Sequence, residues 1–194
     1  MSRLDLVVGP NGAGKSTFVR LTLAHEVPAS VFVNADEIAR REWPDDPVAH
    51  SYDAAARAAE TRRLLIEQHR PFIAETVFSH PSKLTLIDDA RGGGYYVALH
   101  VLMVPEPLAV ARVQTRVAAG GHDVPTEKVV ARYQRLWDLV AQAVGGADTA
   151  SFWDNAHRDG PVLVAFFEDG FIVGEPSWPE WAPAALVTRW PNAQ

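Results

Sequence analysis

A phosphate-binding loop stands near the start of the chain. Residues 9–16 read G-P-N-G-A-G-K-S, match the pattern G-x-x-x-x-G-K-[ST], and follow directly on an apolar run at residues 4–8. In such a loop, backbone N–H groups turn toward a polyphosphate, the lysine reaches the β- and γ-phosphates, and the serine hydroxyl is a ligand for Mg²⁺. The helix that follows aims its N-terminus at the same anion. We therefore expect a nucleotide held by Gly9, Pro10, Asn11, Gly12, Ala13, Gly14, Lys15, Ser16 and Thr17, with Ser16 on the metal.

A carboxylate, Asp36, lies just past the apolar residues 31–33. This is the carboxyl end of an expected strand, where α/β sheets place their ligands. Asp36 could accept the proton of a substrate hydroxyl that attacks a γ-phosphoryl group. Arg40, one helical turn later, could hold a substrate anion beside it. Asp36 could also be the N-cap of a short helix, and the two roles are compatible.

A second carboxylate, Glu75, ends the expected strand at residues 72–74. It could bind substrate hydroxyls, or it could hold a ligand of the Mg²⁺ ion in place without binding the ion itself. We place Thr76 and Ser79, which follow it, on the substrate side as well. The alternative for Glu75 is a carboxylate that caps a helix.

Arginines recur on two consecutive expected helices. Arg112 and Arg116 are four residues apart on the first, Arg132 lies on the second, and a loop with the sequence G-G-H-D-V-P at residues 120–125 joins the helices. Two helices with a glycine-rich joint are typical of a mobile lid, whose arginines close over the phosphates. We expect this role for Arg116 and Arg132, with Arg112 as a further ATP contact. The alternative is that they are solvated arginines on amphipathic helices.

The elements that must position these residues alternate between strand and helix. We expect strands at residues 4–8, 31–33, 72–74, 96–104 and 150–153, and helices at 15–25, 48–69, 81–91, 107–119 and 126–144. The alternation predicts an α/β fold with a parallel sheet of about five strands, flanked by helices.

A different pattern follows residue 155. An Asp-Gly turn at residues 169–170 predicts a β-hairpin, and a tail rich in Trp and Pro follows it. We expect one domain over residues 1–194, with a lid at about 107–140 and a C-terminal hairpin and tail at about 156–194. The tryptophans of the tail are expected to pack rather than to act in a site.

Composition excludes several classes of protein. The net charge of −6 argues against a general nucleic-acid surface, which would need a basic stripe. The chain has no Cys, which excludes disulfides and thiolate zinc sites. No apolar run reaches membrane-spanning length and no signal peptide precedes the first strand, so we expect a cytoplasmic protein without membrane contact.

Taken together, the motifs resemble those of the zeta-toxin-like P-loop kinases, which are UDP-N-acetylglucosamine kinase-like. The resemblance covers residues 3–156 and rests on G-P-N-G-A-G-K-S, N-A-D-E-I-A-R, E-T-x-x-S, R-x-x-x-R-V-x-x-G-G-H-D-V-P and a late D-N. It implies an adenylate-kinase-like core, ATP and Mg²⁺ as cofactors, and phosphorylation of a small molecule. In well-known zeta toxins the acceptor is the 3′-hydroxyl of a UDP-activated amino sugar, and an antitoxin protein holds the toxin inactive.

The resemblance also implies roles for individual residues. By position, Asp36 matches the catalytic base, Lys15 and Ser16 match the residues on ATP and Mg²⁺, and Glu75 matches an acidic substrate-binding residue. Arg116 and Arg132 match the lid arginines. The pair at residues 154–155 would lie near the adenine, although a turn at the end of a strand explains it equally well.

One departure from the family pattern concerns the acceptor. The larger toxins read E-G-T-L-R after the third strand, whereas this chain reads E-T-V-F-S at residues 75–79. The arginine is replaced by Ser79, which removes a possible contact to a diphosphate. The family resemblance therefore predicts a small-molecule kinase, but it leaves the nucleotide sugar open as the acceptor.

Three other functions stay open. The protein could be an antibiotic or other metabolite phosphotransferase on the same core. It could be a polynucleotide 5′-kinase, although the acidic composition weighs against this. It could also be a nucleotide-binding switch without transfer chemistry, although no guanine-specifying N-K-x-D sequence is present.

Overall fold

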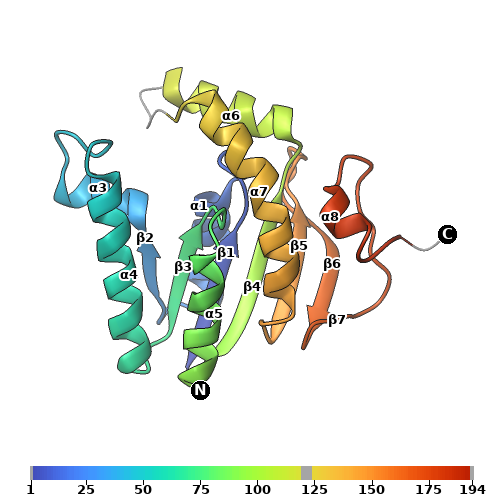
Figure 1. Ribbon diagram of the computed structural model, residues 1–194, viewed down its shortest axis with the longest axis horizontal. Helices are drawn as coiled ribbons and strands as arrows, with labels where there is room; N and C mark the ends of the chain where they lie inside the picture. The colour runs from blue at the N-terminus through green and yellow to red at the C-terminus, as the bar shows by residue number, and fades with distance from the viewer. Residues whose placement is uncertain (1, 119–123, 193–194) are drawn as a thin grey trace.

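The computed structural model describes residues 2–118 and 124–192, which form an α/β fold around one sheet (Figure 1). Seven strands occur in this sheet in the order β2-β3-β1-β4-β5-β6-β7. They are β1 (Arg3–Val8), β2 (Val31–Asn34), β3 (Phe72–Thr76), β4 (Tyr96–Met103), β5 (Thr149–Asp154), β6 (Val162–Glu168) and β7 (Phe171–Ile172). The strands β2, β3, β1, β4 and β5 are parallel, which confirms the predicted core.

The C-terminal hairpin extends the sheet. Strand β6 pairs antiparallel with β5, and β7 pairs antiparallel with β6, so the sheet is mixed and larger than the five strands expected. The edge of β5 would otherwise expose unpaired backbone N–H and C=O groups, and the hairpin covers them. The tail then packs on this end of the sheet: Trp178 contacts Phe152 and Trp190 contacts Phe167, with ring centroids 5.3 and 4.7 Å apart.

Helices cover both faces of the sheet. In Figure 1, α5 and α7 lie in front of the strands and α1 lies behind them. The helices are α1 (Lys15–Phe18), the π-helix η1 (Val19–Leu23), α2 (Ala24–Glu26), α3 (Ala35–Glu42), α4 (Ser51–Glu67), α5 (Ser82–Gly92), α6 (Glu106–Ala118), α7 (Thr126–Val144) and α8 (Ala184–Val187). In the part of the chain that the structure describes, no helix has the length and apolar character needed to cross a membrane.

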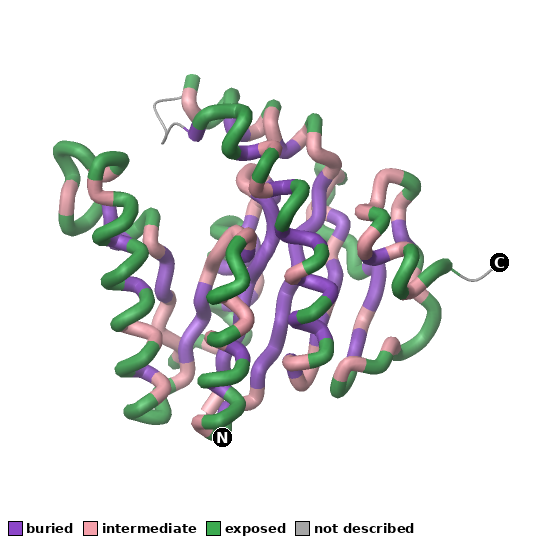
Figure 2. The backbone as a smooth tube through the Cα atoms, in the orientation of Figure 1, coloured by how far each residue is buried: buried purple, intermediate pink, exposed green. Residues whose placement is uncertain are grey.

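The central strands form the core that positions the site. Almost every residue of β1 and β4 is buried, as expected for parallel strands with helices on both faces (Figure 2). Strand β1 ends at Val8, directly before the phosphate-binding loop. The loop therefore rises from the buried centre of the sheet.

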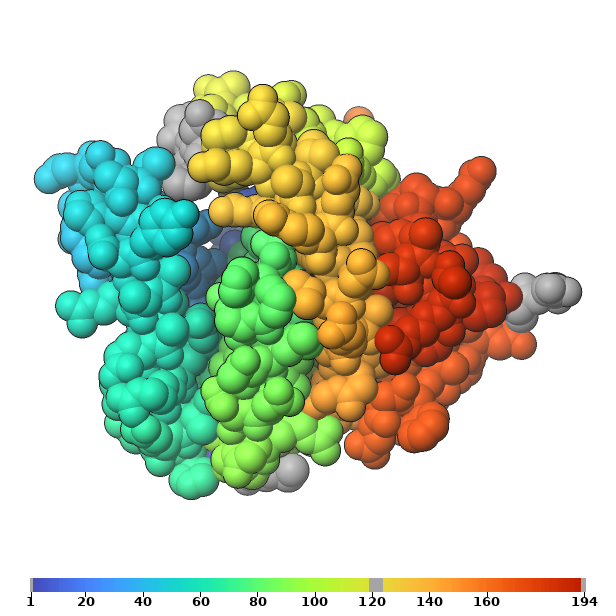
Figure 3. Space-filling view, viewed as in Figure 1, coloured from blue at the N-terminus to red at the C-terminus, as the bar shows by residue number. Residues whose placement is uncertain are grey.

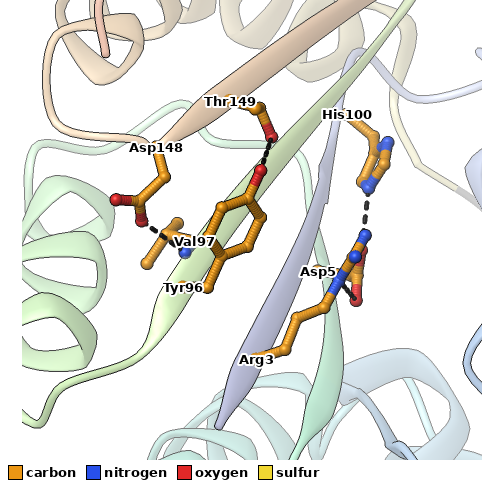
Figure 4. A network of polar contacts seen from close by, with 7 residues as sticks. All are labelled: Arg3, Asp5, Tyr96, Val97, His100, Asp148 and Thr149. Carbon is orange, nitrogen blue, oxygen red and sulfur yellow. Dashed lines mark hydrogen bonds and ion pairs between the residues drawn. The ribbon is translucent and has the colours of Figure 1, made fainter. Parts of the chain in front are cut away.

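A buried carboxylate interrupts the apolar run of β1. Asp5 is fully buried and accepts hydrogen bonds from Arg3 Nε and Nη2, at 2.9 and 2.7 Å, and from His100 Nε2 at 2.9 Å (Figure 4). Burial alone would raise the pKa of Asp5, but the hydrogen bonds from His100 and Arg3 outweigh it and hold the pKa below its ordinary value. The charged form of Asp5 therefore stabilises the fold.

We expect Asp5→Ala to lower the free energy of unfolding by about 3 kcal/mol at neutral pH, because it leaves the buried donor of His100 without its acceptor. The stabilisation is present above the unfolded-state pKa of Asp5 and is lost as pH falls through the lower folded-state pKa. The deficit should therefore shrink in acid. Urea unfolding at several pH values would measure it, with Asp53→Ala as the control, since that carboxylate is exposed and pairs with His50. A loss of unfolding free energy in Asp5→Ala that does not change with pH would contradict this explanation.

Candidate active site

The phosphate-binding loop joins β1 to α1 and depends on its glycines. Gly12 and Gly14 have φ angles of 79° and 85°, which L side chains rarely adopt. A Cβ atom on Gly12 would lie 2.5 Å from the carbonyl oxygen of Ala109, and one on Gly14 would lie 2.5 Å from Asn155 Nδ2. Both the backbone conformation and the available space therefore require glycine at these positions.

Two side chains support this loop from outside. Asn155 Nδ2 donates to the carbonyl oxygen of Ala13 at 2.7 Å, and Arg112 Nη1 donates to the carbonyl oxygens of Asn155 and Gly12, at 3.0 and 3.5 Å. We expected Arg112 as an ATP contact, but here its guanidinium lies against backbone carbonyls of the loop. Asp154 is buried and accepts from the backbone N of Ala156 at 2.8 Å, which is the turn that we named as an alternative.

Lys15 is buried within the loop that it serves. Its side chain is 7% exposed, and Nζ donates to the carbonyl oxygens of Gly9 and Pro10 at 3.1 and 3.0 Å. Burial lowers the pKa of the Lys15 ammonium below its ordinary value.

Four charged side chains act on this ammonium. Glu75 and Asp36 raise the pKa of Lys15, whereas Arg116 and Arg132 lower it further. They come from β3, α3, α6 and α7. The predicted acids and the predicted lid arginines therefore all lie within electrostatic reach of Lys15.

Glu75 joins the loop to the end of β2. Its carboxylate accepts from Ser16 Oγ, at 2.8 and 3.0 Å to its two oxygens, and from Asn34 Nδ2 at 2.7 Å. Asn34 and Glu75 are register partners at the ends of the parallel strands β2 and β3, which explains why they meet. The N-terminus of α5 has no side-chain cap, so the capping alternative for Glu75 is wrong.

Asn34, which the sequence analysis missed, is the N-cap of α3. Its Oδ1 accepts from the backbone N–H groups of Asp36 and Glu37, at 2.7 and 3.2 Å. Asp36 is therefore not the N-cap, and its carboxylate is exposed. Arg40 Nε donates to the backbone oxygen of Asp36 at 3.1 Å, so this side chain lies beside the start of the helix as expected. An Asn followed two and three residues later by acidic residues is a helix-start signal that could have identified the cap.

The remaining predicted residues surround this cluster. Thr76 ends β3, and its Oγ1 accepts from the backbone N of Phe78 at 3.4 Å, where the chain turns with a φ of 64°. Ser79 is half-buried beyond this turn, and Thr17 is exposed on α1. The predicted joint of the lid at residues 120–123 lies outside the described residues.

A cleft separates the α3–α4 side of the molecule from α6 and α7. Figure 3 shows a hollow between these parts, with N-terminal residues at its floor. On one side, Val113 of α6 and Val129 of α7 share a small apolar cluster with Val124, so these two helices pack as a unit. Asp36 belongs to α3 on one side of the cleft, and Arg116 and Arg132 belong to α6 and α7 on the other.

The residues present fit a nucleotide with a divalent metal ion. The glycines of the phosphate-binding loop have no room for side chains. Asn11 Oδ1 is buried in the same loop without a hydrogen-bond partner. Among the described residues, no group of three His, Cys, Asp or Glu side chains could hold a metal by itself. An ion beside Ser16 would therefore draw further oxygen ligands from phosphates and water, as Mg²⁺ does at nucleotide sites.

Relatives detected by sequence agree with this geometry. The family model AAA_33, described as an AAA domain, matches residues 4–139. A protein from Haemophilus influenzae, described only as uncharacterized, is 30% identical over 126 residues, which are 64% of this chain and 88% of the relative.

Solved structures share the fold. The AvrRxo1-ORF1:-ORF2 structure with ATP has a TM-score of 0.68 and 15% identity, covering 89% of this chain but only 60% of the matched chain. The PezAT toxin–antitoxin system of Streptococcus pneumoniae has a TM-score of 0.62 and 15% identity, covering 85% of this chain and 72% of the other. A putative kinase from Chloroflexus aurantiacus has a TM-score of 0.53 and 16% identity, covering 66% and 74%. Because the AAA_33 match spans most of the chain and includes the phosphate-binding loop, this protein belongs to the AAA_33 family of AAA domains.

Proposed function

We propose that the protein is an ATP- and Mg²⁺-dependent kinase that phosphorylates a hydroxyl of a small molecule. The observation that carries this proposal is that Asn34 joins the start of α3, where Asp36 is exposed, to the Glu75 carboxylate, which accepts from Ser16 Oγ of the phosphate-binding loop at 2.8 Å. A site that only binds a nucleotide needs the loop, but it does not need an exposed carboxylate beside the phosphates. When bound, MgATP supplies the phosphoryl group that is transferred.

Each side chain then has a distinct task. Asp36 is exposed at the start of α3 and is not used as a cap, so its carboxylate can take the proton of the acceptor hydroxyl. Lys15 and the backbone of the loop hold the phosphates. Arg116 and Arg132 offset the negative charge that develops on the transferred group.

In this proposal, the acceptor molecule is bound by Arg40, Glu75, Thr76 and Ser79. The family resemblance suggests a UDP-amino sugar as the acceptor. Because Ser79 stands where the larger toxins have an arginine, another metabolite or an antibiotic is an equally good candidate. PezAT is a toxin–antitoxin system, and its similarity in fold supports a possible antitoxin partner for this chain.

The acceptor can be identified by labelling. We expect ATP labelled at the γ-phosphate to transfer its label to one class of compound in a panel of UDP-amino sugars, antibiotics and 5′-hydroxyl oligonucleotides, or in a small-molecule cell extract. Label on the oligonucleotides would replace the proposal with a polynucleotide kinase. Tight nucleotide binding with no labelled acceptor would instead support a binding module.

A further inference from the structure

We infer that Asn34 is a positioning residue that fixes the proposed base and the proposed metal ligand relative to each other. The inference rests on the proposed function for its catalytic part. Asn34 is 6% exposed and lies at the end of β2, between the helix that carries Asp36 and the carboxylate of Glu75. No other described side chain hydrogen-bonds to both of these groups.

Both ends of the Asn34 amide are in use. Two backbone N–H groups, of Asp36 and Glu37, point at one end and identify it as the oxygen. The other end is therefore the NH₂ group, which donates to Glu75 at 2.7 Å. Aspartate could cap the helix but, when ionised, could not donate. Serine or threonine could accept and donate only from one oxygen that lies closer to the backbone than the two ends of the amide.

The hydrogen bond from Asn34 sets the orientation of Glu75, and Glu75 in turn orients Ser16. Ser16 Oγ has one proton, which it donates to Glu75, so its lone pairs remain available for a metal ion. A partner of this kind fixes the orientation of a metal ligand without touching the metal. A continuous chain of hydrogen bonds thus runs from the first turn of α3 through Asn34 and Glu75 to Ser16.

Asn34→Asp tests this role because it keeps the cap oxygen and replaces the donor with a second carboxylate that faces Glu75. We expect the variant to fold with a melting temperature within a few degrees of wild type and to lose about 10- to 100-fold in kcat/KM.

A second variant separates the loss of the donor from the added charge. Asn34→Ser keeps a cap oxygen and introduces no carboxylate, and its one short hydroxyl replaces the two ends of the amide. It should lose activity as well, which an effect of added charge alone would not produce.

A second readout does not require phosphoryl transfer. Calorimetric titration with ATP, with and without Mg²⁺, should show that Asn34→Asp reduces the gain in affinity from Mg²⁺ by about tenfold and leaves metal-free binding near wild type. Asn192→Asp is a matched control: its amide accepts from and donates to the backbone of Trp178, far along the chain. It should leave the effect of Mg²⁺ unchanged.

The outcomes separate the inference from the proposed function. If wild type transfers no phosphate but Asn34→Asp loses the Mg²⁺ effect, the proposed function fails and the positioning of Ser16 stands. If Asn34→Asp matches wild type both in its Mg²⁺ effect and in its kcat/KM, the inference is overturned.

Discussion

Replacing Asp36 with asparagine is expected to lower the rate of phosphoryl transfer by about 10³-fold, within the range that general-base catalysis contributes. ATP affinity should stay within about twofold, because the phosphates are held by the loop and Lys15. The substitution keeps the shape of the side chain and removes the group that accepts the proton. Steady-state kinetics with the identified acceptor, together with calorimetric titration of ATP, would measure both quantities.

The structure indicates that this substitution changes the proposed base without disturbing the helix that carries it. The cap of α3 is Asn34, and the carboxylate of Asp36 is exposed, so the helix does not depend on that side chain. The adjacent Glu37 is a matched control, because it is also an exposed acid in the first turn of α3. Glu37→Gln should keep transfer within a few-fold of wild type. If both variants lost the same factor in transfer rate, the cause would be the loss of negative charge near the site, and Asp36 would not be the base.

The parts of the site that were predictable from sequence are those fixed by local pattern. The loop at residues 9–16 has a fixed spacing of residue types. Each parallel strand is an apolar run that can be recognised without knowing which other segment it pairs with. The placement of Asp36 and Glu75 at strand ends followed from the same pattern. The charges of Arg116 and Arg132 act on Lys15, and their role as lid arginines stays a prediction.

The parts that were missed depend on pairs far apart in the chain. Asn34 meets Glu75 only because β2 and β3 pair in one particular register, which their sequences do not specify. Asp5 looked like an exception in an apolar run, and its partner His100 lies on another strand. Arg112 had the charge of a phosphate ligand, but only the packing of α6 shows that its guanidinium faces backbone carbonyls.

Replacing Lys15 with methionine is expected to lower transfer by about 10³-fold, because it removes a fixed positive charge from the phosphates. The same substitution should raise the free energy of unfolding of the nucleotide-free protein by about 1 kcal/mol. Lys15 is buried, and burial lowers its pKa, which means that the fold disfavours the ammonium form. Methionine fills a similar volume without a charge. Opposite changes in activity and stability are the signature of a residue kept for function.

The pH dependence of this stability difference tests its cause. The folded-state pKa of Lys15 lies below the unfolded-state value, so between the two the unfolded chain binds more protons and wild type gains stability as pH rises. The advantage of Lys15→Met should therefore shrink toward alkaline pH. Urea unfolding at about pH 7 and about pH 10 would measure it, with Lys128→Met as a control, since Lys128 is exposed on α7. A Lys15→Met protein that is less stable than wild type at neutral pH would show that the hydrogen bonds to Gly9 and Pro10 outweigh the burial of the charge.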